Sequence, residues 1–115
     1  MSREHERVVL MVSELLNVLF SMGAEDIGVQ VREGPEDFSI SLQGKTRGDI
    51  RQKLQKARRL LRMPRRREME EELWSLAGSV DYDTELSLVG MMTDKADVRH
   101  EEETGMVEIE LLRKK

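Results

Sequence analysis

Apolar residues recur at helical spacing near the start of the chain. Between residues 6 and 22 they fall three or four positions apart, which predicts an amphipathic helix. Its apolar stripe consists of Val8, Val12, Leu15 and Leu19, widened by Val9, Leu16 and Phe20. Gly23 follows the stripe, and a glycine at that place is typical of a helix C-terminus.

Two later regions alternate between apolar and polar residues, and each predicts a β-hairpin. The first has strands at 27–31 and 38–42, joined by the turn-forming sequence at 33–37. The second has a short strand at 96–98 and a longer one at 107–111, joined by a turn at Thr104-Gly105. The inward positions are expected to be Ile27, Val29, Val31, Phe38, Ile40, Leu42, Ala96, Val98, Val107, Ile109 and Leu111.

Three helices are predicted between the two hairpins. Thr46-Arg47-Gly48-Asp49 has the form of a capping box, and the helix after it ends at Met63-Pro64 because a residue before proline avoids helical geometry. A second helix is expected over about 65–77, and Asp83 or Thr84 is expected to cap a short third one. The apolar positions of these helices are Ile50, Leu54, Ala57, Leu61, Met69, Leu73, Leu76, Leu86, Val89 and Met92.

The element order is therefore α-β-β-α-α-α-β-β, with helices between two hairpins that each have an apolar face. The economical packing is a two-layer α/β sandwich of the α+β class, in which helices cover one face of a mixed or antiparallel sheet of about four strands. A length of 115 residues favours a single domain over 1–115.

Composition removes several classes of function. The chain has no cysteine and two histidines, which excludes disulfides, thiolate metal sites and a thiol nucleophile, and leaves us expecting no metal site. No apolar run approaches the roughly 20 residues that a membrane span needs, and the polar N-terminus is unlike a signal peptide. We therefore expect a cytoplasmic protein that does not contact a membrane.

The net charge of −4 conceals a strong asymmetry. Residues 45–67 hold eleven of the 19 lysines and arginines and one acid, so their net charge of +10 contrasts with −14 elsewhere. Three interpretations stay open: pairing with acids such as Glu68, Glu70, Glu71 and Glu72, an acidic protein partner, or nucleic acid. An aromatic content of 3% gives no platform for stacking bases. The candidate partner-binding residues are Arg51, Arg58, Arg59, Arg62, Arg65, Arg66 and Arg67.

Two segments carry a resemblance to a known family. The first runs from Val12-Ser13-Glu14-Leu15-Leu16-Asn17 through the strand pair to Leu42, and the second from Leu86-Ser87-Leu88-Val89-Gly90 to Leu111. Together they resemble the histidine-kinase-like ATPase superfamily, and within it the short anti-sigma regulatory factors with serine-kinase activity. The resemblance implies the fold of that superfamily, a role in transcription regulation and signal transduction, and a pocket for magnesium-ATP.

The positions that the resemblance assigns to nucleotide contacts depart from the family pattern. The family places a metal-binding asparagine four residues after a glutamate, whereas here Val18 stands at that distance from Glu14 and Asn17 is one position short. Residues 44–48 stand where the family has Asp-Asn-Gly-x-Gly, and only Gly48 remains. Asp83-Thr84-Glu85 replaces a phosphate-binding Gly-x-Gly, and its carboxylates would repel phosphate.

These departures lead to one expectation and two alternatives. We expect a regulatory protein-binding domain with an eroded nucleotide site, without kinase activity, whose residual pocket would comprise Asn17, Lys45, Thr46, Gly48 and Thr84. The family's N-terminal strand and helix are missing, so we also expect a trimmed domain that forms a homo-oligomer, in the simplest case a dimer. The alternatives are an ATP-binding serine kinase that contacts phosphates through Lys45 and Arg47, and a small nucleic-acid-binding protein that uses the basic 45–67 segment.

Overall fold

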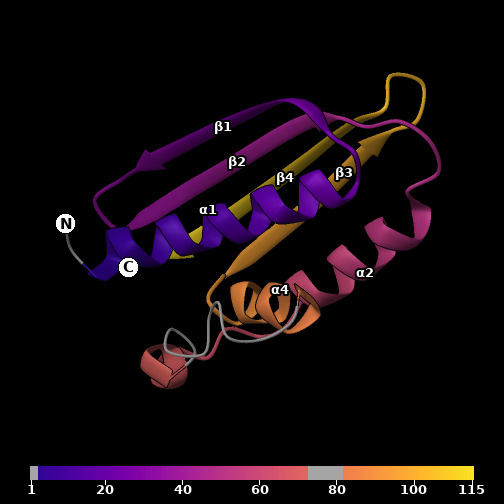
Figure 1. Ribbon diagram of the computed structural model, residues 1–115. Helices are drawn as coiled ribbons and strands as arrows, with labels where there is room; N and C mark the ends of the chain where they lie inside the picture. Colours follow the sequence, from indigo (N-terminus) through magenta and orange to yellow (C-terminus); the bar gives the residue numbers. More distant parts are fainter. Residues whose placement is uncertain (1–2, 73–81) are drawn as a thin grey trace.

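The computed structural model describes residues 3–72 and 82–115 and arranges them as helices packed on a four-stranded sheet (Figure 1). In chain order the elements are α1 (Arg3–Ser21), β1 (Glu25–Glu33), β2 (Asp37–Lys45), α2 (Arg51–Leu61), the 3₁₀ turn η1 (Arg67–Met69), α4 (Tyr82–Met91), β3 (Lys95–Glu101) and β4 (Met106–Lys114).

The sheet is antiparallel throughout, in the order β1-β2-β4-β3. The two predicted hairpins are present and join through their second strands, where Ile40 pairs with Leu111 and Leu42 with Ile109. The predicted α+β class and four-stranded sheet are thereby confirmed. Of the mixed and antiparallel sheets that the sequence allowed, the antiparallel one is present. β1 and β3 are the edge strands.

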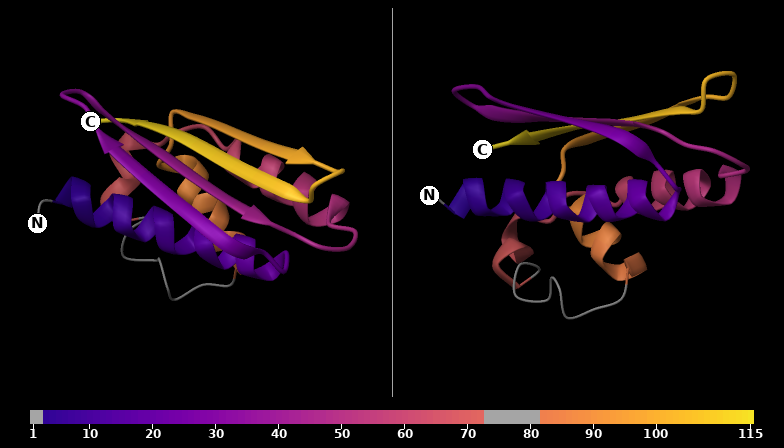
Figure 2. Two further views of the ribbon diagram at one scale, coloured as in Figure 1. Left: turned by 90° about the horizontal axis from the view of Figure 1, so that it is seen from above. Right: turned by 45° about the horizontal axis from the view of Figure 1, so that its top comes forward.

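The helices lie on one face of the sheet, which makes two layers (Figure 2). α1 contacts β2, α2 contacts β3, and α4 contacts both other helices. This places α1 near the β1 edge and α2 near the β3 edge. The other face of the sheet, which we call the outer face, carries polar and charged side chains such as Ser39, Ser41 and Glu110.

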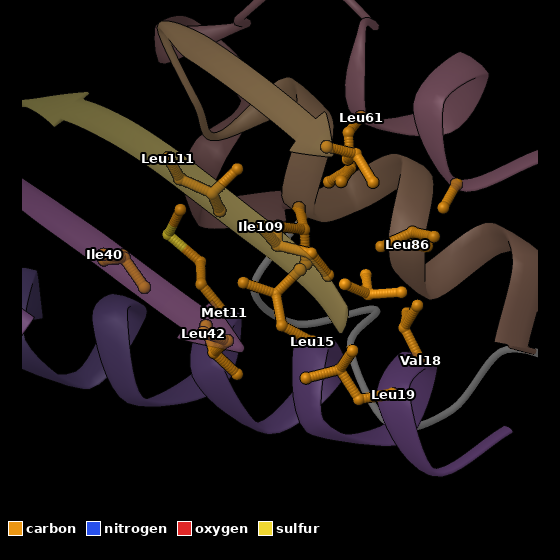
Figure 3. Close-up of a cluster of buried hydrophobic side chains, with 14 of the residues drawn as sticks. Met11, Leu15, Val18, Leu19, Ile40, Leu42, Leu61, Leu86, Ile109 and Leu111 are labelled. Carbon is orange, nitrogen blue, oxygen red and sulfur yellow. The ribbon is translucent and has the colours of Figure 1, made fainter. Parts of the chain in front are cut away.

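The core lies between the two layers. Figure 3 shows Met11, Leu15 and Leu19 of α1 pointing toward the strands, and Leu86 of α4 near them. The predicted inward residues of β2, α2 and β4 are all buried, since their spacing matches the period of each element. The residues concerned are Phe38, Ile40, Leu42, Ile50, Leu54, Ala57, Leu61, Val107, Ile109 and Leu111.

The predicted ends of several elements are confirmed. Gly23 follows α1 with a φ of 73°, in the left-handed region that favours glycine at a helix end. Gly105 closes the turn between β3 and β4 with a φ of 79°. α2 ends at Leu61, two residues before Met63-Pro64, with Arg62 at its C-cap.

The predicted capping box is wrong. α2 begins at Arg51 with Ile50 at the N-cap, and no side chain caps it there. Thr46 instead lies four residues before that cap, where its backbone N–H and its hydroxyl both donate to the Gly105 carbonyl, at 2.7 and 2.8 Å. A contact between segments far apart in the chain has replaced the local one. Asp49 takes part of the capping role by accepting the Arg51 N–H at 3.1 Å.

Two other helix predictions need correction. The helix expected from residue 65 starts later, because residues 64–66 are irregular and Arg67–Met69 form a 3₁₀ turn before helical residues at 70–72. Its expected continuation, with Leu73, Trp74 and Leu76, lies outside the described residues. α4 already includes Asp83 and Thr84, so neither is its N-cap.

Candidate interaction surfaces

Three of the five expected nucleotide-contacting residues line one recess. Lys45, Thr46 and Gly48 meet at a hollow of about 590 Å³ between the β2–α2 segment and the β3–β4 turn. Thr46 is buried, and its hydroxyl is occupied by the Gly105 carbonyl. Gly48 adopts a φ of 81°, so it shapes the loop that leads into α2. In this recess Thr46 ties two turns together, and Lys45 supplies a positive charge.

The other two expected contacts are placed differently. Asn17 is an exposed residue of α1 and is not among the residues that line the recess, while its neighbour Val18 is fully buried in the core. The one-residue offset seen in the sequence therefore turns the amide away from the helix's buried side. Thr84 belongs to the first turn of α4, and its side chain lies outside the described residues.

The charges around the recess are mixed. Arg47 and Arg51 line it with Lys45, but so do Asp49, Glu102 and Glu103. Arg51 binds Asp49 through its side chain and its backbone N–H, and these hydrogen bonds lower the pKa of Asp49 to about 2. Arg47 lies 3.5 Å from Glu25. Of the three cations that line the recess, Arg47 and Arg51 therefore already have carboxylate partners. This makes the recess a weaker site for an anion.

The arginines of residues 45–67 divide into two groups, and the first is used within the fold. Arg58 donates two hydrogen bonds to the Val98 carbonyl of β3, at 3.1 and 2.9 Å. Arg65 binds Glu70 and Asp94, and Arg67 donates to carbonyls at the C-terminal end of the chain. The Arg65–Glu70 pair bears out, for that arginine, the interpretation that nearby glutamates neutralise this region.

The second group faces solvent. Arg59, Arg62 and Arg66 are exposed, and no carboxylate of residues 3–72 or 86–115 lies within ion-pair distance of them. Arg59 and Arg62 continue the spacing of the exposed Gln52 and Gln55, three or four residues apart along α2. We call these four residues the basic stripe. It lies on the opposite side of α2 from Leu54, Ala57 and Leu61, which face the core.

A buried ion cluster escaped sequence reasoning. Arg113 of β4 is fully buried and contacts Glu70 and Glu4, while Arg65 joins Glu70 to Asp94. The signal was present, since Arg113 continues the inward period of 107, 109 and 111. The cluster ties β4 to the start of α1 and to the segment after α2.

An exposed apolar strip also escaped it, because its members were expected to lie in the core. Val9 and Phe20 of α1 are 53% and 63% exposed, and Val29 and Val31 of β1 are 46% and 44% exposed. Val12, Leu16 and Ile27 are partly buried beside them. These seven residues form the apolar strip, which follows α1 and the neighbouring sheet edge. Between the N-terminal half of α1 and Val31 it sinks into a groove of about 610 Å³.

The groove ends at a polar contact. His5 of α1 lies 2.8 Å from Glu33, and Lys115 lies 2.6 Å from the same carboxylate. Hydrogen bonds from Lys115 and His5 lower the pKa of Glu33. The apolar strip is therefore bounded by charge at the end where α1 begins.

Comparison with known proteins gives no match, whether to a protein family, a curated protein or a solved structure. Within the described residues no three His, Asp or Glu side chains are grouped as a metal ion requires. None of the helices in that part of the chain combines the length and apolarity that crossing a membrane would demand. The candidate sites of this chain are thus the recess, the basic stripe and the apolar strip.

Proposed function

We propose that this chain is a regulatory protein-binding domain of the histidine-kinase-like ATPase architecture, with an eroded nucleotide site. It acts by binding an acidic protein surface through the basic stripe on α2. The observation that carries the proposal is the exposed, unpaired state of Arg59 and Arg62 among the described residues, whereas Arg58, Arg65 and Arg67 of the same basic segment hold carboxylates or carbonyls.

The state of the recess supports a function without nucleotide. Asn17 does not line it, and the Thr46 hydroxyl is held by the Gly105 carbonyl. Two carboxylates of the β3–β4 turn, Glu102 and Glu103, line the same hollow and oppose a polyphosphate. In this proposal the chain keeps part of the family's element order and has lost its nucleotide contacts.

The chemistry of the basic stripe supports a protein partner. Guanidinium groups form bidentate hydrogen bonds with carboxylates, and arginine is enriched where protein interfaces concentrate their binding energy. Gln52 and Gln55 add neutral donors and acceptors along the same side of the helix. A nucleic-acid partner would need more phosphate contacts than two arginines give, and the chain as a whole is acidic.

The test places a photo-crosslinking residue at Gln55, within the stripe, so that both arginines stay intact. Irradiation in an extract of the cells that naturally produce the chain should give a protein adduct that resists nuclease and weakens with added salt. Arg59→Glu should reduce the yield about tenfold, because it reverses one charge of a paired contact.

Two controls make the result specific. Lys95→Glu changes the net charge by the same amount as Arg59→Glu, at an exposed residue of β3. It should leave the adduct unchanged. A crosslinker at Gln43, on the outer face, should not give the same adduct. A nuclease-sensitive adduct would instead support nucleic-acid binding, and equal adducts at Gln43 and Gln55 would overturn the proposal.

A further inference from the structure

The two edges of the sheet are treated differently by the rest of the chain. At the β3 edge, Arg58 covers the backbone by donating twice to the Val98 carbonyl, and the strand carries Lys95, Asp97, Arg99 and Glu101. Charged residues and covered carbonyls are the usual protection of an edge strand against pairing. This edge is therefore the less favourable of the two for pairing with another strand.

At the β1 edge no arginine of the described residues covers a strand carbonyl, and the charged side chains lie only at the two ends of the strand, at 25–26 and 32–33. β1 is nine residues long, β2 alone of the described strands pairs with it, and its helix-side residues Ile27, Val29 and Val31 are apolar. Val29 and Val31 are nearly half exposed, beside the exposed Val9 and Phe20 of α1. An edge of this length and apolarity is a template for a further strand.

We propose that a second copy of this chain covers the apolar strip, with the two β1 strands paired antiparallel about a two-fold axis at Val29. A two-fold interface brings one surface against itself, so that surface has to be self-complementary. In this register Val29 meets Val29 of the partner subunit, and Ile27 meets the partner's Val31. All the helix-side apolar residues of the strand then face apolar residues.

The regular part of β1 favours the same register. Residues 28–33 pair with β2 without interruption, and the bulge sets Glu25 and Asp26 apart from them. With the axis at Val29, Arg32 of each copy comes to the bulged end of the partner's strand, which carries acidic side chains. Moving the axis to Gln30 would instead set the apolar Ile27 opposite the partner's Glu33.

The strand also limits its own pairing. A β-bulge displaces the register between Glu25 and Gly28, and Pro35 lies in the turn beyond the other end. Pairing two β1 edges leaves only β3 edges at the ends of the joined eight-stranded sheet, where Arg58 and the charged side chains of β3 hinder further pairing. The assembly therefore closes as a dimer and does not continue as a fibre.

The dimer is independent of the proposed function and complements it. α2 packs near β3 and α1 near the β1 edge, so an axis at β1 leaves the two basic stripes on the outer sides of the dimer. Two such surfaces in one particle would bind a partner with paired acidic sites more tightly than one surface does.

The first experiment measures molar mass by light scattering during size exclusion. The parent chain should elute as a dimer and Val29→Lys as a monomer, because the substitution buries two lysines against each other. Gln30→Lys, on the outer face of the same strand, should stay dimeric. Val29 is partly exposed in one copy, so Val29→Lys should stay folded and give the circular dichroism spectrum of the parent chain. A monomeric parent chain, or a dimeric Val29→Lys, overturns the proposal.

The second experiment tests the register and exploits the absence of cysteine. In Val29→Cys the two thiols sit at the axis, where paired Cα atoms are about 5 Å apart and a disulfide can form. In Val31→Cys, on the same face, the two copies of the residue are separated by four positions, about 14 Å. Mild oxidation should link the first variant and not the second. The reverse result, or equal linking of both, excludes this register.

Discussion

Arg113 and Glu70 form a buried pair in which each guanidinium Nη donates to one carboxylate oxygen, both at 3.0 Å. Arg113 also donates to the Met92 carbonyl at 2.7 Å and to Glu4, which lies 109 residues away in the sequence. The pair therefore joins the last strand, the first helix, the end of α4 and the segment after α2. It fixes how the helical layer sits on the sheet near the chain termini.

Removing the carboxylate of this pair should be costly. Glu70→Leu leaves Arg113 buried with less compensating charge, and the free energy of unfolding should fall by about 3 kcal/mol in urea titrations. Glu70→Leu combined with Arg113→Met removes both charges and should recover most of the loss. Glu71→Leu, whose carboxylate pairs with Arg3 and Arg7 at the surface, should cost under about 1 kcal/mol. A double variant no more stable than Glu70→Leu would contradict this account of the pair.

The same cluster should make stability depend on acid. Burial raises the pKa of Glu70, but hydrogen bonds from Arg113 and Arg65 outweigh it and hold that pKa below its ordinary value. Burial likewise raises the pKa of Asp94 and of Glu4, and hydrogen bonds again reverse the effect, from the Lys114 N–H and Arg65 for Asp94 and from Arg113 for Glu4.

A carboxyl whose pKa is lowered in the folded state stabilises the fold above its unfolded pKa of about 4. That contribution is lost as the pH falls through the lower, folded value. Urea unfolding measured from pH 7 down to pH 2.5 should therefore show stability declining below about pH 4.5. In Glu70→Gln the decline should be shallower, because one titrating group is gone, and an unchanged profile would argue against the cluster as its source.

Gly90 marks the closest approach of α2 and α4. A Cβ at this position would lie 2.3 Å from the Leu60 carbonyl oxygen, which is backbone and cannot move aside. Alanine normally stabilises a helix relative to glycine by up to about 1 kcal/mol, but Gly90→Ala should destabilise the chain by about 2 kcal/mol.

The control for that substitution is Gly23→Ala, at a site with a φ of 73° and open space around the added methyl. It should cost about 1 kcal/mol from backbone strain alone. Thermal unfolding of the three proteins tests the crossing, and a Gly90→Ala chain more stable than the parent would show that the two helices do not touch there.

Local patterns predicted α1, α2, the two hairpins and most of the core. The stripe of Leu54, Ala57 and Leu61, and the alternation of Val107, Ile109 and Leu111, each faced inward as expected, since period and burial agree within one element. Features set by distant segments were not predictable in this way. Thr46 binds Gly105, 59 residues away, in place of the nearby helix end.

Periodicity also shows which side of an element is apolar without showing whether anything covers it. Val9 and Phe20 extend the apolar stripe of α1, but no described residue covers them and they are exposed. Arg113 is the reverse case: its position in β4 predicts burial, whereas its charge predicts exposure to solvent. It is buried because carboxylates from two distant parts of the chain, Glu4 and Glu70, pair with it. The basic stripe and the apolar strip differ in the same way. The arginines of the stripe could be identified from the sequence, whereas the exposure of the apolar strip could be recognised only from the fold.

The proposed function requires the chain to work through its surfaces and without nucleotide. Calorimetric titration with magnesium-ATP, paired with melting curves at millimolar ligand, tests it most directly, with magnesium sulfate at equal ionic strength as the control. We predict no saturable heat and the same melting temperature in both solutions. Saturable binding below about 1 mM, with a melting temperature several degrees higher than in the control, would contradict the account.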